Sequence, residues 1–222
     1  EHDDQAVVMA VSPAGLVELS KDGDNWNGVF RETESSQDVV IRPDLEKLDL
    51  SVRDFINLDT LSAGDSGRTV GPKAAKLGEL RKHFPEAVSA GVAIPFGVFR
   101  EVVLDKPYRQ SQQTVFEWMV ESYRNIEKLP SGSAERKETA ERFRAELYGL
   151  ILQARLDAGN QKRLRAAMQQ AFGSLDRLGV FIRSDTNVED LAGFTGAGLN
   201  LTLPNVVGFE NVVDGIAKVW AS

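Results

Sequence analysis

The sequence has no cysteine and only two histidines among its 222 residues. The absence of cysteine excludes a disulfide framework, a thiolate metal site and catalysis by a cysteine nucleophile, but it leaves the redox compartment open. The chain also lacks an apolar run of the roughly 18 to 20 residues that a helix needs to cross a bilayer. We therefore expect a protein that does not span a membrane.

Positive charge is also scarce, because 26 Lys and Arg residues stand against 33 Asp and Glu residues, and the formal net charge is -7. Binding to a nucleic-acid backbone requires a basic face that neutralises several phosphates, so we expect no nucleic acid as a partner. A single nucleotide needs only two or three local cations. The composition is that of an ordinary soluble globular protein. We expect a cytoplasmic location, although the chain begins with Glu1 rather than Met and a targeting peptide could precede it.

The first fifty residues are predicted to be β-rich. Two short apolar runs, at 6–11 and 16–19, flank the turn sequence SPAG and indicate a hairpin. Further strand candidates follow at 29–31 and 39–42. We therefore predict a β-rich segment over 1–50 and a separate domain over 51–222.

The middle of the chain is predicted to be helical. Apolar residues recur at helix spacing over 116–123, 143–151 and 164–172. Ser133 is placed to cap the second of these helices.

A helix is also predicted after residues 70–73 (VGPK), where an apolar pattern begins. Gly71 would give the turn its freedom, and Pro72 is acceptable at the first helical position. Lys73 then lies in the first turn, where the helix dipole and unpaired N–H groups already favour an anion and the lysine adds a mobile cation. The alternative is an ordinary exposed lysine.

Residues 180–182 (VFI) form a continuous apolar run, which predicts a strand buried on both faces with Arg183 at its carboxyl end. The planar fork of an arginine suits bidentate recognition of phosphate. A glycine-rich segment follows at 193–198, and an alternating strand pattern over 199–203. Two alternatives stay open: an ion pair of Arg183 with a nearby acid (Asp185, Glu189 or Asp190), and a tight hairpin at the glycines.

These segments, taken in order, resemble the ATP-binding domain of the phosphoenolpyruvate synthase and pyruvate phosphate dikinase family, which glucan water dikinases share. Residues 70–80 are similar to the Gly-Gly-Lys helix start of the family, and 91–99 to its Val-Pro-Pro-Gly-Phe strand. Residues 182–191 are similar to its Val-Arg-Ser-Ser and Glu-Asp-Leu segment, and 205–222 to the strand end and helix that follow. The resemblance covers about 54–222.

The resemblance implies an α+β fold: an incomplete ATP-grasp-like domain with a helical insertion, whose second lobe and Mg2+ ligands lie beyond this chain. It implies that Lys73 and Arg183 contact ATP phosphates and that Arg183 acts in catalysis. It further implies that a loop containing Gly193, Thr195, Gly196 and Gly198 closes over those phosphates.

The resemblance also implies that the intact parent is a phosphotransferase, which passes a phosphoryl group from ATP to a histidine on another domain and then to pyruvate or a glucan. Neither histidine of this chain matches such an acceptor, so we expect the chain alone to be inactive. The alternative is a non-catalytic nucleotide-sensing or assembly domain. Pro72 removes a backbone donor, and Asp185 could pair with Arg183 and compete with the nucleotide.

Overall fold

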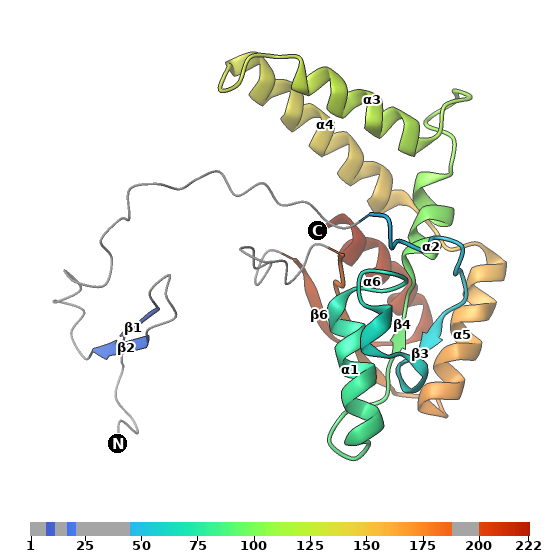
Figure 1. The fold of residues 1–222 in the computed structure, drawn as a ribbon. Helices are drawn as coiled ribbons and strands as arrows, with labels where there is room; N and C mark the ends of the chain where they lie inside the picture. The colour runs from blue at the N-terminus through green and yellow to red at the C-terminus, as the bar shows by residue number, and fades with distance from the viewer. Residues whose placement is uncertain (1–7, 12–16, 21–44, 188–199) are drawn as a thin grey trace. The chain divides into compact units, whose positions relative to one another are not determined.

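The computed structural model describes residues 8–11, 17–20, 45–187 and 200–222 (Figure 1). Contacts along the chain divide it into two units, Glu1–Val40 and Ile41–Ser222, and each is described by itself. The predicted domain boundary at residue 50 stays a prediction.

In the first unit, β1 (Val8–Val11) pairs antiparallel with β2 (Val17–Ser20). Val8 lies opposite Ser20 and Val11 opposite Val17, which confirms the predicted hairpin. The strand candidates at 29–31 and 39–42 lie outside the described residues.

The second unit mixes helices with short antiparallel strand pairs, and this confirms the α+β prediction. Within the described residues, its strands form two pairs, β3 with β4 and β5 with β6. The helices are α1 (Pro72–His83), α2 (Phe96–Phe99), α3 (Val115–Glu127), α4 (Ala134–Gln153), α5 (Ala158–Phe172) and α6 (Phe209–Ala221). The strands are β3 (Ile56–Asn57), β4 (Val92–Ala93), β5 (Gly179–Arg183) and β6 (Thr202–Val207).

The predicted helices of the middle region are α3, α4 and α5, and side-chain caps fix where they begin. Thr114 and Glu117 form a capping box at α3, and Ser133 accepts a hydrogen bond from the Arg136 N–H at α4, as predicted. At α5, Asp157 accepts from the Asn160 N–H at 2.7 Å, and this bond lowers the pKa of Asp157. None of the helices in the described ranges is both long and apolar enough to cross a bilayer.

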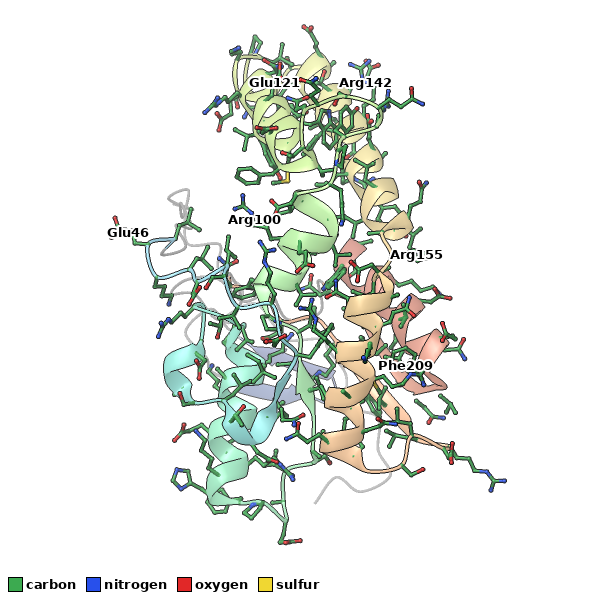
Figure 2. All side chains as sticks on the ribbon, turned by 90° about the vertical axis from the view of Figure 1, so that its right-hand side faces the viewer. Glu46, Arg100, Glu121, Arg142, Arg155 and Phe209 are labelled. Atoms are coloured by element: carbon green, nitrogen blue, oxygen red, sulfur yellow. The ribbon has the colours of Figure 1, made fainter. Side chains whose placement is uncertain are left out.

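The main core gathers apolar side chains from α2, α5 and α6, among them Val98, Leu164 and Ile216. In Figure 2, α5 and α6 lie side by side, with Phe209 labelled at the start of α6; the Arg165 guanidinium lies 3.8 Å from the centre of its ring. A smaller core lies under α1 and consists of Leu58, Leu61, Val70, Ala75 and Ala93.

The prediction that β5 is buried on both faces is wrong. Its residues alternate, with Val180 and Ile182 partly buried against the main core, while Phe181 is 68% exposed and Arg183 is exposed. The physical reason is that, within the described residues, β5 pairs only with β6, and α6 packs against this pair. One covered face gives the alternating pattern of a half-buried strand.

Two other strand predictions had the wrong bounds. The strand expected over 91–99 is only β4, because Pro95 has no backbone N–H for a ladder and the chain turns into α2 at Phe96. The strand expected over 199–203 begins at Thr202. Leu201 is outside it, and Leu199 lies outside the described residues.

Candidate functional site

The start of α1 and the end of β5 meet, although they are far apart in the sequence. The backbone N–H of Lys73 donates to Oδ1 of Asp185 at 2.8 Å, across 112 residues of chain. The N–H of Ala74 donates to Oδ2 of the same carboxylate at 3.2 Å. Asp185 therefore caps α1 from a distant segment. We call residues 71–74 together with 183–186 the α1–β5 junction.

The side chain of Lys73 completes the contact from the other side. Its Nζ donates to the backbone oxygen of Ser184 at 3.2 Å and lies 3.5 Å from Oγ of Ser184. Ser184 itself is buried. The two segments thus hold each other, one through a carboxylate on backbone amides and the other through an ammonium group on a carbonyl.

Gly71 is required at this junction for space rather than for backbone freedom. Its φ of −77° is open to any residue, so the expectation that it frees the turn is wrong. A Cβ at this position would lie 2.6 Å from Cγ and 2.7 Å from the backbone carbon of Asp185. Only a residue without a side chain lets the two segments approach so closely.

Arg183 is the last residue of β5 and pairs with Thr202 of β6. Among the residues that the structure describes, its exposed side chain has no hydrogen bond or ion pair. The expected alternative of an Arg183–Asp185 ion pair is wrong, because the Asp185 carboxylate lies on the N-terminus of α1. The other two proposed acids, Glu189 and Asp190, lie outside the described residues.

The junction brings together the segments that carry the two predicted cations. Lys73 Nζ contacts Ser184, the residue that follows Arg183. The other predicted site residues, Gly193, Thr195, Gly196 and Gly198, lie outside the described residues. Sequence reasoning missed the cap that Asp185 forms. One signal was available in the sequence. Gly71, the residue before α1, has no side chain that could cap the helix, so the cap had to come from elsewhere, and aspartate is among the best capping residues.

Two buried hydroxyl groups, one within the junction and one just before it in the sequence, lack hydrogen-bond partners among the described residues. Oγ1 of Thr69 and Oγ1 of Thr186 are buried, and neither makes a hydrogen bond within the described part of the chain. Thr69 precedes the loop that begins α1, and Thr186 follows Asp185. Buried hydroxyls usually have a hydrogen-bond partner, so two that have none in the described part of the chain require an explanation.

The described residues do not form a magnesium site. Over 45–187 and 200–222, no group of three His, Asp or Glu side chains is arranged to hold a metal ion. The single carboxylate of the junction, Asp185, is already bonded to the backbone of α1. We therefore derive no step through magnesium.

Replacement of Asp185 by alanine should lower the free energy of unfolding by about 1 kcal/mol, the usual effect of removing a helix cap. Urea denaturation followed by circular dichroism measures it. Glu138→Ala, at an exposed position on α4, is the control and should change stability by less than about 0.5 kcal/mol. Equal stability of Asp185→Ala and the wild type would show that the observed cap contributes nothing.

Comparison with known proteins agrees with the family resemblance. The model of the pyruvate phosphate dikinase AMP/ATP-binding domain matches residues 67–222, which include α1, β5 and the junction. A phosphoenolpyruvate synthase of Pseudomonas aeruginosa is 27% identical over 174 residues, covering 75% of this chain and 20% of that protein. Another, of Aeropyrum pernix, is 33% identical over 162 residues, covering 69% of this chain and 17% of that protein.

The chain thus spans a fifth or less of the length of these curated relatives. The matched region covers well over half of this chain. The chain therefore belongs to the pyruvate phosphate dikinase family, and residues 67–222 form its AMP/ATP-binding domain or a part of that domain.

Proposed function

We propose that the α1–β5 junction binds the phosphates of ATP, and that the chain does so as part of a longer phosphotransferase. The observation that carries this proposal is the contact of Lys73 Nζ with Ser184, which places a cation from the first turn of α1 beside the residue that follows Arg183. A phosphate at the junction would have two cations and the positive end of a helix dipole within reach.

The two cations contribute differently. Arg183 is exposed and unpaired within the described residues. Its guanidinium can therefore donate hydrogen bonds to two phosphate oxygens without breaking an existing bond. Lys73 must exchange its contact with Ser184 for one with phosphate. Two opposite unit charges 4 Å apart attract each other by about 4 kcal/mol near a protein surface, but by only about 1 kcal/mol in bulk water. The open junction alone should therefore bind nucleotide weakly.

The fold type, the role of the glycine loop and the transfer steps are taken from what is known of the family. The fold is an ATP-grasp-like lobe, and the loop with Gly193, Thr195, Gly196 and Gly198 closes over the phosphates. A histidine nitrogen on another domain forms a bond to phosphorus as the bond from phosphorus to a bridging oxygen of ATP breaks. The phosphoryl group then passes to pyruvate or a glucan. The name of the relatives, phosphoenolpyruvate synthase, supports an acceptor related to pyruvate.

A second candidate function is nucleotide sensing or assembly without catalysis. The observation that favours it is the state of the α1 N-terminus: Pro72 has no N–H, and the N–H groups of Lys73 and Ala74 both donate to Asp185. In this arrangement, the first turn of α1 offers a phosphate no backbone donor.

Replacement of Lys73 or Arg183 by alanine should weaken ATP binding by about tenfold or more in the full-length protein. The physical reason is that a hydrogen bond to a charged group contributes about 1.5 to 3 kcal/mol, and 1.4 kcal/mol corresponds to tenfold in affinity. Calorimetric titration with Mg-ATP measures the change. Lys137→Ala on α4 and Arg124→Ala on α3 are matched exposed controls and should bind as the wild type does. Unchanged affinity in both site variants would remove the junction from the nucleotide site.

Labelling separates the two candidate functions. The full-length protein is incubated with radioactive ATP, and the label is tested for the acid-labile, alkali-stable behaviour of phosphohistidine. Such a label, lost in Arg183→Ala, is the result expected of a phosphotransferase. Binding of ATP with no phosphohistidine would favour the sensing or assembly function.

A further inference from the structure

The N-terminus of α1 already holds an anion, and that anion is part of the chain. Pro72 has no N–H, while the N–H groups of Lys73 and Ala74 donate to the two carboxylate oxygens of Asp185 at 2.8 and 3.2 Å. The N–H of Ala75 donates to the oxygen of Gly71 at 3.3 Å. The carboxylate thus takes the two amides that a phosphate would use at this helix end.

The fit of Asp185 leaves little room for another group. Gly71 lies so close to Asp185 that even a methyl group there would overlap with it. Lys73 Nζ is held by Ser184, the neighbour of Asp185. Departure of this segment would therefore release the amides of α1 and break the contact of Lys73 with Ser184 in one movement.

A second observation concerns two hydroxyls on the same two segments. The hydroxyls of Thr69 and Thr186 are buried and have no hydrogen-bond partner in the described residues. Thr69 is only 6% exposed. Buried polar groups without partners are unfavourable, and an ion or a water molecule bound beside them is one explanation.

We propose that the Asp185 carboxylate is an internal anion, which keeps free inorganic anions away from the α1 N-terminus and gives way only to the phosphate of a bound nucleotide. A tethered group competes at a high effective concentration, and its negative charge repels a second anion. Inorganic phosphate can offset that competition only through Lys73 and Arg183. A nucleotide has the contacts of its base and ribose in addition. This inference rests on the proposed function for the identity of the displacing ligand.

The test is a titration with inorganic phosphate, in which the amide resonances of Lys73 and Ala74 are followed by NMR. In the wild-type chain, we expect no saturable change at these two amides. In Asp185→Ala, we expect saturable changes at both, with an apparent affinity at least tenfold higher than that of the wild type. Asp185→Asn keeps the shape of the side chain and one acceptor oxygen, so it serves as the second variant if Asp185→Ala does not fold. Its gain in apparent affinity for phosphate should be smaller than that of Asp185→Ala.

The matched control is Asp157→Ala, which removes an aspartate cap from α5. It should create no comparable phosphate binding at the Asn160 amide, because the Glu101 carboxylate, which accepts from Asn160 Nδ2 at 3.4 Å, would repel an anion there. Three results would overturn the proposal: no gain in folded Asp185 variants, equally tight phosphate binding at α1 in the wild type, or an equal gain at α5. Failure of the proposed function is seen separately, as absence of Mg-ATP binding to the wild type.

Discussion

Replacing Gly97 by alanine should destabilise the second unit by about 3 kcal/mol, the upper end of the usual range for overpacking a buried site. Gly97 lies in the first turn of α2, next to the fully buried Val98. A Cβ at Gly97 would overlap with the backbone oxygen of Val52 and lie 2.6 Å from that of Leu50. Both obstacles are backbone atoms, so relief requires a shift of the chain rather than a change of rotamer.

Urea denaturation measures this change, and Gly149→Ala is the matched control. Gly149 lies within α4 and has nothing within 4 Å of the position of a Cβ. Alanine there should stabilise the protein by about 0.5 to 1 kcal/mol, because glycine is a poor residue inside a helix. Equal effects of the two substitutions would show that the close approach at Gly97 is not real.

Truncation of Ile216 to alanine should cost about 2 to 5 kcal/mol, the range for removing a large aliphatic side chain from a core. Ile216 lies on α6, is 3% exposed and belongs to the main core, against which Val180 and Ile182 of β5 also pack. The loss therefore removes support from the strand that ends at Arg183.

Thermal and urea unfolding measure the effect of the Ile216 substitution. Ile216→Val should cost only about 0.5 to 1.5 kcal/mol. Lys218→Ala, at an exposed position of the same helix, should change stability by less than about 0.5 kcal/mol. A similarly small loss in Ile216→Ala would mean that α6 is not packed against this core.

Local patterns were enough to predict most helices. Helix spacing and capping residues are properties of a few consecutive positions, and so Pro72 at the start of α1 and Ser133 at the start of α4 could be recognised in the sequence. The junction of α1 and β5 was expected only because the order of motifs resembles a known family. Spacing alone left it open whether Lys73 is a phosphate ligand or an exposed lysine, and whether Arg183 binds phosphate or pairs with a nearby acid.

The remaining features depend on contacts between distant segments. An apolar run such as 180–182 occurs both in a strand in the middle of a sheet and in a strand of a two-stranded pair. The exposure of its side chains could therefore not be predicted from the sequence of the run. The cap of α1 lies 112 residues away. At Gly71 and Gly97, another part of the chain approaches too closely for a side chain, and a local sequence pattern does not reveal such a contact.

The central claim is that nucleotide phosphates bind at the α1–β5 junction, and the most direct measurement is a map of amide chemical-shift changes in the wild-type chain during titration with Mg-ATP. Because the site is open, we expect weak binding. The largest saturable changes should occur at Lys73, Ala74 and Ser184, where the two segments meet. Saturable changes confined to α3, α4 or α5, with the junction unchanged, would contradict the claim.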